Sequence, residues 1–216
     1  MRTVTSNRLT AALVGLFFAL TAAVWGLISP VGSSADEGFH LTSIWCAWGE
    51  HETCVIQELE DGQSGFAVPA AITSAKPCFV TEQGEGGELS AACVEDVSDS
   101  LVLSSGNQGS YPPVYYAVTR ILVGPNTEFS VLAIRILNAI LAGALLAFAL
   151  MIVKRPIRIA LTLTWVVSLV PLGLFFIGSV NPSSWAIVGV GTYWAFLLNW
   201  LSSASLKSRT AWLSLV

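Results

Sequence analysis

The chain has 216 residues, of which 54% are hydrophobic and 11% are charged, and its net charge at neutral pH is −4. An ordinary soluble domain carries about 25% charged residues, so this composition excludes a typical water-soluble protein. It also argues against nucleic-acid binding, because an acidic surface repels phosphate backbones and the sequence contains no nucleic-acid-binding motif.

Four apolar segments are long enough to cross a membrane as helices. The first contains a run from Leu9 to Ile28 without a charged residue, and about 20 such residues span a hydrocarbon core of about 30 Å. The sequence therefore predicts an α-helical polytopic membrane protein. The expected spans are residues 9–29, 129–153, 159–179 and 184–201.

The first span has an alternative interpretation as a cleaved signal peptide. Arg2 and Arg8 precede it, and Ser33-Ser34-Ala35 offers small residues for cleavage. The apolar run is longer than the usual signal core of about 7–15 residues, so we favour a retained anchor. In both cases the chain that follows leaves the cytoplasm.

Basic residues outside the spans set the expected orientation. By the positive-inside rule, residues 1–8 and 154–158 are cytoplasmic, and residues 202–216 are a cytoplasmic tail or the start of a further helix. Residues 30–128 then form an extracytoplasmic loop domain, and residues 180–183 an external turn. The basic residues on which this depends are Arg2, Arg8, Lys154, Arg155, Arg158, Lys207 and Arg209.

All four cysteines lie in the predicted external domain, where an oxidising compartment allows disulfides. Because short loops close most easily, we expect the pairs Cys46–Cys54 and Cys78–Cys93, although four cysteines permit three pairings. A metal site that uses His51 beside Cys54 is the alternative. The cysteines lack the close C-x-x-C spacing of structural zinc sites, which favours disulfides.

The segment Tyr111 to Leu122 predicts a short helix. Pro113 suits the first turn of a helix, and Val114, Val118 and Ile121 recur at helical spacing. Tyrosines at one end are typical of the lipid headgroup region. The helix lies either on the outer leaflet or on the core of the external domain itself.

Polar residues also lie at the outer ends of two spans. Arg135 and Asn138, three residues apart, share one face of the second span. A charge inside a span normally faces protein, water or an anion, unless it extends to the interface. Asn181-Pro182 predicts an external turn, and the helix after it could present backbone N–H groups to a phosphate.

The sequence contains no soluble-enzyme motif, but a combination of short motifs resembles one family. In order, they lie after the first span, before and in the second span, and at the next external turn. The motifs are Ser29-Pro30, Asp36-Glu37-Gly38-Phe39-His40, Tyr111-Pro112-Pro113-Val114-Tyr115-Tyr116, Arg135-Ile136-Leu137-Asn138 and Asn181-Pro182. With these motifs, the chain resembles the bacterial predicted-membrane-protein family called domain of unknown function 2142, itself similar to the GT-C superfamily of membrane glycosyltransferases.

The resemblance implies a GT-C-like fold and a site at the outer surface of a bacterial inner membrane, with the N-terminus in the cytoplasm. A GT-C enzyme transfers a sugar from a polyprenyl-phosphate carrier to an acceptor, here an envelope glycan or lipid. Its early acidic residue would be Asp36 or Glu37, acting as general base or holding a divalent cation such as Mg²⁺ or Mn²⁺. His40 would orient the acid, whereas the alternative role for both acids is a solvated helix cap.

Residues of the same motifs, together with Arg120, would bind the substrate: Tyr111, Arg135, Asn138 and Asn181. Arg120 and Arg135 would hold the leaving phosphate, with Lys76 as a weaker candidate. GT-C proteins usually have many more spans, so a second hypothesis is a non-catalytic assembly or sensor subunit with a protein partner. A transporter is a third, although no inverted repeat is visible.

Overall fold

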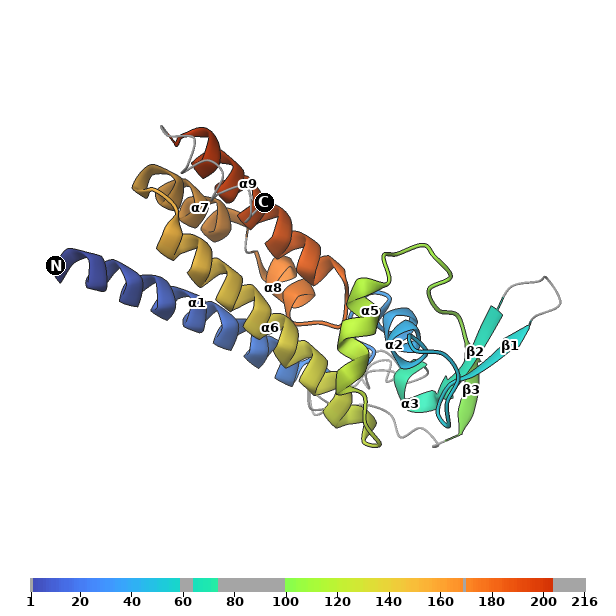
Figure 1. Cartoon of the computed structure of the whole chain (residues 1–216). Helices are drawn as coiled ribbons and strands as arrows, with labels where there is room; N and C mark the ends of the chain where they lie inside the picture. The colour runs from blue at the N-terminus through green and yellow to red at the C-terminus, as the bar shows by residue number, and fades with distance from the viewer. Residues whose placement is uncertain (1, 59–63, 74–99, 169, 204–216) are drawn as a thin grey trace. The chain divides into compact units, whose positions relative to one another are not determined.

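The computed structural model describes residues 2–58, 64–73, 100–168 and 170–203. The chain divides into two compact units (Figure 1). The mixed unit contains residues 25–136 and 179–182, and the helical unit contains residues 1–24, 137–178 and 183–216.

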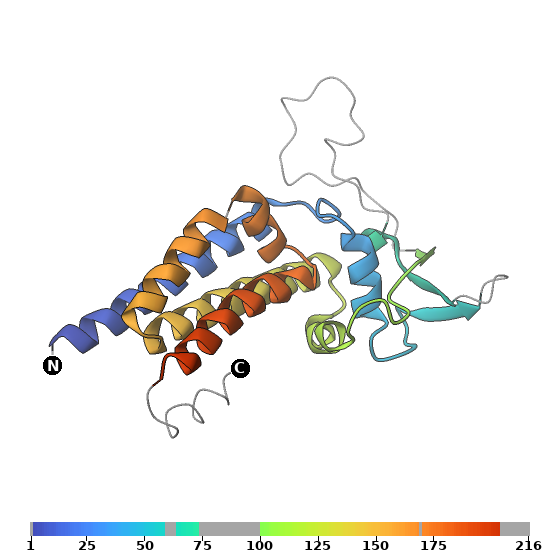
Figure 2. The same cartoon turned by 90° about the horizontal axis from the view of Figure 1, so that it is seen from above.

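The mixed unit is built around a short, buried helix, α2 (Glu37–Trp45). Figure 2 shows α2 between α5 (Val114–Thr119) and the sheet. The apolar side chains of Leu41, Ile44 and Trp45 fill the space around α2, and their burial stabilises the unit.

The sheet is antiparallel, in the order β1-β2-β3. Its strands are β1 (Val55–Glu58), β2 (Ser64–Pro69) and β3 (Leu101–Ser104). Phe66 of the central strand pairs with Ile56 and with Ser104. The remaining elements are α3 (Ala70–Thr73) and the 3-10 helix η1 (Arg120–Leu122).

A disulfide joins Cys46 to Cys54, directly after α2. This confirms the first expected pair, and it overturns the metal alternative at His51 because neither thiolate remains to bind an ion. The second expected pair, Cys78–Cys93, lies outside the described residues. A short antiparallel bridge between His51 and Cys54 tightens the same loop.

Two described helices are long and apolar enough to cross a membrane, over Arg8–Ile28 and Thr127–Ile152. They belong to α1 (Arg2–Ile28) and α6 (Thr127–Ile152) and coincide with the first two expected spans. The third expected span is instead a pair of helices, α7 (Arg155–Ser168) and α8 (Pro171–Ile177), bent by 98°. Proline cannot continue a helix from its preceding turn, which accounts for a break before Pro171.

The fourth expected span corresponds to α9 (Ser183–Leu201). By length and composition, the described helices include two spans, or three if α7 and α8 form one broken span. The count of four spans therefore stays a prediction.

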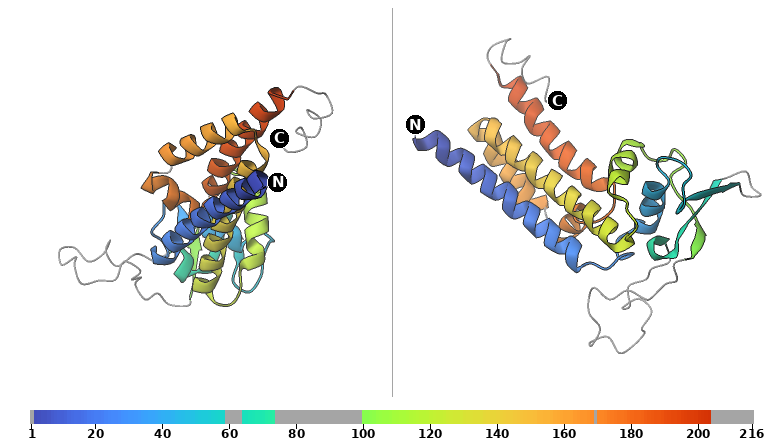
Figure 3. Two further views of the ribbon diagram at one scale, coloured as in Figure 1. Left: turned by 90° about the vertical axis from the view of Figure 1, so that its left-hand side faces the viewer. Right: turned by 60° about the horizontal axis from the view of Figure 1, so that its bottom comes forward.

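In the helical unit, α1 and α6 run side by side at close range (Figure 3). A Cβ atom placed on Gly15 would clash with the Gly143 carbonyl oxygen and lie 2.5 Å from the Ala147 Cβ; one on Gly143 would lie 2.6 Å from the Ala19 Cβ. Small residues spaced four apart on both helices allow this approach, as in other membrane helix pairs.

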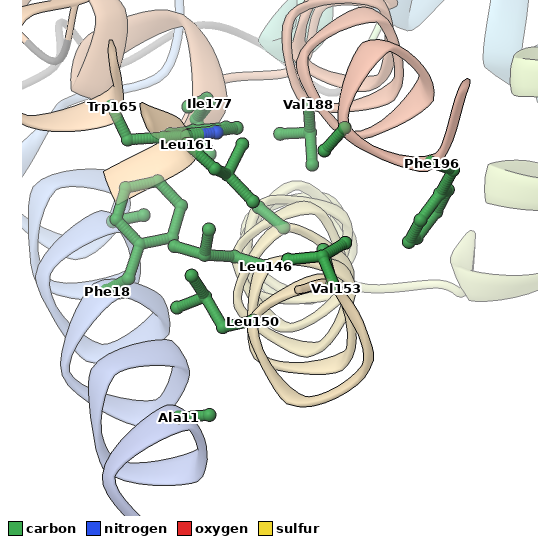
Figure 4. Close-up of a cluster of buried hydrophobic side chains, with 14 of the residues drawn as sticks. Ala11, Phe18, Leu146, Leu150, Val153, Leu161, Trp165, Ile177, Val188 and Phe196 are labelled. Carbon is green, nitrogen blue, oxygen red and sulfur yellow. The ribbon is translucent and has the colours of Figure 1, made fainter. Parts of the chain in front are cut away.

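Larger side chains complete the core of the helical unit beside this contact (Figure 4). Phe18 meets Trp165 edge to face, with ring centroids 5.4 Å apart. Leu146 and Leu150 of α6 and Leu161 of α7 pack in the same buried cluster. The core thus joins α1, α6 and α7 through dispersion contacts rather than polar ones.

Gly15→Ala should destabilise the helical unit, whereas Gly189→Ala should not. A Cβ at Gly15 meets backbone, but one at Gly189 meets nothing within 4 Å. Overpacking lowers the free energy of unfolding by about 1–3 kcal/mol. This loss outweighs the gain of up to about 1 kcal/mol from the higher helix propensity of alanine. Thermal unfolding in detergent should show a lower midpoint for Gly15→Ala alone. Equal midpoints for the two variants would contradict the close contact.

Candidate functional site

The mixed unit contains a buried ion pair between Glu37 and Arg135. Glu37 is 1% exposed and Arg135 is 3% exposed. The Arg135 Nη2 donates to Oε1 and Oε2 of Glu37 at 2.8 and 2.9 Å, and Nε lies 3.2 Å from Oε1. Two parallel charge-assisted bonds of this kind are strong and fix the geometry of both side chains.

The remaining donors of Arg135 go to the backbone at the end of α1. Nη1 donates to the carbonyl oxygen of Gly26 at 2.8 Å and also to that of Ser29, and Nη2 donates to that of Pro30 at 3.1 Å. The last carbonyls of a helix lack partners within it. Arg135 supplies a partner for one of them, that of Gly26, and also binds two carbonyls of the residues that follow the helix, so the guanidinium holds the end of α1 as well as neutralising Glu37.

The Glu37 carboxylate also accepts hydrogen bonds from two backbone N–H groups in loops. The Gly32 N–H donates to Oε2 at 2.9 Å, and the Val180 N–H lies 3.4 Å from Oε1. The pair therefore ties together the end of α1, the start of α2, the first part of α6 and the turn at residues 179–182. We call this network the Glu37–Arg135 clamp.

The clamp changes the roles that the sequence suggested for its two residues. A phosphate could bind Arg135 only by displacing Glu37 or backbone carbonyls. Glu37 could accept a proton only by leaving a buried guanidinium without its counter-charge, which is costly. Both side chains are therefore better suited to holding the site together than to reacting.

Asp36, the neighbour of Glu37, is exposed. It occupies the N-cap position of α2 in the left-handed conformation, with φ 57° and ψ 16°, and its side chain makes no capping hydrogen bond. Asp is among the few residues that tolerate this conformation. The Asp36 carboxylate therefore does not cap α2, contrary to the alternative role suggested by the sequence.

His40 lies one turn further along α2, in a cluster of aromatic rings. Its Nδ1 lies 3.0 Å from the Tyr116 hydroxyl, and its ring meets Tyr111 edge to face at 5.3 Å. Burial lowers the pKa of His40, while the charge of Asp36 opposes this shift. Burial, with a contribution from Tyr111, raises the pKa of Tyr116 to about 12.

The sequence placed Tyr111 and His40 in the candidate site, and the structure brings their rings together. Tyr116 was not proposed, although it belongs to the same motif as Tyr111. Tyr116 lies five residues after Tyr111, on the buried side of α5. This position in the motif was the signal that could have identified it as a site residue. The neutral imidazole and the neutral phenol form one hydrogen bond in which either can donate.

Two other predicted substrate-binding residues make structural contacts. The Arg120 guanidinium lies over the Trp48 ring, 5.5 Å from its centroid, and Nη2 lies 3.0 Å from the His51 Nε2. Burial lowers the pKa of Arg120. Asn181 is buried, and its Nδ2 donates to the Ala35 carbonyl at 3.4 Å. Lys76 lies outside the described residues.

The helical unit contains a groove of 540 Å³ between α6 and α9. At one end Asn138 accepts a hydrogen bond of 3.0 Å from the Trp185 indole, and the buried Ser184 hydroxyl has no partner in the described part of the chain. The rest of the groove is apolar, along Leu141 to Phe148. Its apolar lining with polar groups at one end suits a hydrocarbon chain that ends in a polar group.

A family model described as a predicted membrane protein (DUF2142) matches residues 17–216. The chain belongs to this family. Comparisons with curated proteins and with solved structures found no match.

The DUF2142 match confirms the family resemblance drawn from the short motifs. It includes both residues of the Glu37–Arg135 clamp, Asp36 and the groove-lining residues. The family description supports a membrane protein, in agreement with the apolar helices α1 and α6.

Removing either member of the clamp should destabilise the DUF2142 protein strongly. Glu37→Gln and Arg135→Gln should each cost about 3–5 kcal/mol, because each leaves a buried charge unpaired. The double variant should lose less than the sum of the single losses. Thermal unfolding in detergent measures this, with Glu52→Gln, an exposed carboxylate, as control. Single variants as stable as wild type would contradict the clamp.

His40 should make the stability of the mixed unit depend on pH. Its pKa in the folded chain is below the ordinary value of 6.5, so the unfolded chain binds a proton first as pH falls. Stability is then fully present above about pH 6.5 and is lost as pH falls below that value. His40→Gln should flatten the change in unfolding midpoint between about pH 7.5 and 5.5. An unchanged pH profile in this variant would assign the dependence to other groups.

Proposed function

We propose that this DUF2142 protein is a GT-C-like membrane glycosyltransferase, with Asp36 as its general base. The donor would be a sugar on a polyprenyl-phosphate carrier, and the acceptor an envelope glycan or lipid at the outer face of a bacterial inner membrane. The observation that carries the proposal is the contrast between two adjacent carboxylates. Glu37 is bound in an ion pair with Arg135, whereas Asp36 is exposed and does not cap its helix.

The position of Asp36 suits a donor that is tethered to a membrane. The residue follows the last residue of α1, Ile28, by eight positions. A carrier phosphate is held at headgroup level, so a reactive carboxylate must lie within a few residues of the end of a span.

In the proposed reaction, the Asp36 carboxylate accepts the proton of an acceptor hydroxyl. The hydroxyl oxygen bonds to the anomeric carbon of the sugar, and the bond from that carbon to the phosphate oxygen breaks. The carrier leaves as its phosphate, and the proton passes from Asp36 to solvent. General base catalysis of this kind contributes about 10²–10⁴-fold to the rate.

The leaving phosphate needs positive charge, which Arg135 supplies only if the clamp opens. A divalent cation such as Mg²⁺ or Mn²⁺ would supply positive charge to the leaving oxygen. Holding that cation is the alternative role of the Asp36 carboxylate, because one carboxylate cannot bind the metal and accept the proton at the same time. The His40–Tyr116 pair would position Asp36 from one turn away. Arg120 could contribute only by leaving its contact with Trp48.

The second candidate function is a non-catalytic assembly or sensor subunit. One observation favours it: the basic residue best placed by sequence for a phosphate, Arg135, has its donors engaged within the protein. A subunit of this type would need the clamp and the disulfide but not the Asp36 carboxylate. The two candidates therefore differ in what happens when only that carboxylate is changed.

Asp36→Asn should abolish sugar transfer while leaving the fold intact. Asn also tolerates the left-handed conformation, so the variant removes the base without straining α2. Full-length protein in nanodiscs would be given a radiolabelled hexose on polyprenyl phosphate, and sugar released to water or to added membrane glycan would be counted. We expect a loss of about 10²–10⁴-fold.

Glu52→Gln is the matched control, because it removes another exposed carboxylate of the mixed unit. It should transfer sugar like the wild type. Undiminished transfer by Asp36→Asn would refute the role of Asp36. If the wild type transfers no sugar at all, with or without Mg²⁺ or Mn²⁺, the non-catalytic subunit is the better description.

A further inference from the structure

The helix α5 and the 3-10 helix η1 carry an apolar stripe on their exposed side. Val114, Val118 and Ile121 follow one another at spacings of four and three residues, and so share one face. Val114 is 61% exposed and Ile121 is 68% exposed. On the opposite face, Tyr115, Tyr116 and Thr119 are buried. The segment is therefore amphipathic, with its polar and aromatic residues turned inward.

Trp48 extends this stripe from a different part of the chain. The indole Nε1 donates to the Ala117 carbonyl oxygen of α5 at 3.2 Å, and the side chain is nevertheless 62% exposed. Three aliphatic side chains and an indole thus form one surface, which we call the apolar stripe: Trp48, Val114, Val118 and Ile121. Contiguous exposed apolar surface of this kind marks a contact site more often than a solvated surface.

The continuation of the chain indicates what the stripe contacts. Only residues 123–126 separate η1 from the first residue of α6, Thr127, where a candidate membrane span begins. Five peptide steps reach at most about 18 Å. Phe129, in the first turn of α6, is exposed as well, as are Leu27 and Ile28 at the end of α1. All of these residues belong to the mixed unit.

The side chains around the stripe match the chemistry of a membrane surface. An indole prefers the level of the headgroups, with its ring in the apolar layer and its N–H in a polar contact. Arg120, which lies over the same ring, can keep its aliphatic stem in apolar surroundings. Glu50 and Glu52 follow Trp48 in the sequence, so local charge does not favour binding to an anionic surface.

We propose that the apolar stripe lies in the interfacial layer of the membrane that α1 and α6 enter. The occupant is lipid, and insertion is driven by apolar area rather than by attraction to anionic headgroups. Tyr116, on the other face of α5, contacts His40 of α2. A stripe fixed in the interfacial layer therefore also holds α2 at a defined depth relative to the membrane. The exposure of the stripe and its short link to α6 support this placement, which does not require the proposed transferase activity.

Site-specific photo-crosslinking tests the contact. A diazirine-bearing amino acid would replace Ile121, and in a second protein Val114, in the full-length chain. Vesicles would contain phosphatidylcholine alone or phosphatidylcholine with phosphatidylglycerol. The matched control position is Ile56 of β1, which is also apolar and exposed. We expect lipid adducts at positions 121 and 114 in both vesicles, several-fold above the yield at position 56.

Correct folding of each protein is checked by its Cys46–Cys54 disulfide, detected by mass spectrometry after digestion without reduction. A crosslink from position 121 to a second copy of the chain, in place of lipid, would overturn the proposal in favour of a dimer contact. A lipid yield at positions 121 and 114 no higher than at position 56 would also overturn it. Adducts that appear only with phosphatidylglycerol would contradict insertion driven by apolar area.

Discussion

The mixed unit depends on one constraint: a guanidinium buried near the start of a membrane helix must be neutralised and hydrogen-bonded. Arg135 meets this requirement with the carboxylate of Glu37 and with backbone carbonyls at the end of α1. An unpaired charge there would be costly in either apolar protein or lipid. The loop at Gly32 and the turn at Val180 are held by the same carboxylate, so four segments share a single electrostatic centre.

Two adjacent acidic residues consequently have different environments. Glu37 begins α2 and points into the clamp, while Asp36 precedes the helix in a backbone conformation that leaves its carboxylate in solvent. At the start of a helix, neighbouring side chains point in different directions. One acid can therefore be buried in a structural ion pair while the acid before it is exposed to solvent. The same logic applies to α5, whose two faces contact the domain core and an exposed environment.

Local patterns predicted the elements well. The apolar runs predicted α1 and α6, Pro113 and the valine spacing predicted α5, and the short cysteine spacing predicted the Cys46–Cys54 bridge. Each of these depends on residues that are close in the sequence. The open question about the helix at residues 114–122 arose because its two faces carry different signals, and the structure buries the tyrosine face.

The site was only partly predictable, because its decisive contacts join distant residues. Glu37 and Arg135 are 98 positions apart, and nothing in the spacing of either motif shows that one neutralises the other. The available signal was chemical: a lone base in a span needs a counter-charge, and an acid follows the neighbouring span. The pairing of Asn138 with Trp185 likewise depends on tertiary packing, which local patterns do not show. The break before Pro171, in contrast, has a local cause in the proline itself.

The left-handed backbone at Asp36 constrains how this position can vary in evolution. Glycine and asparagine fit that conformation at little cost, whereas valine, isoleucine and threonine do not. A relative with glycine at this position could therefore keep the clamp, the helix and the membrane fold while having no carboxylate. Under the role proposed for Asp36, such a relative would lose the chemistry and keep the structure.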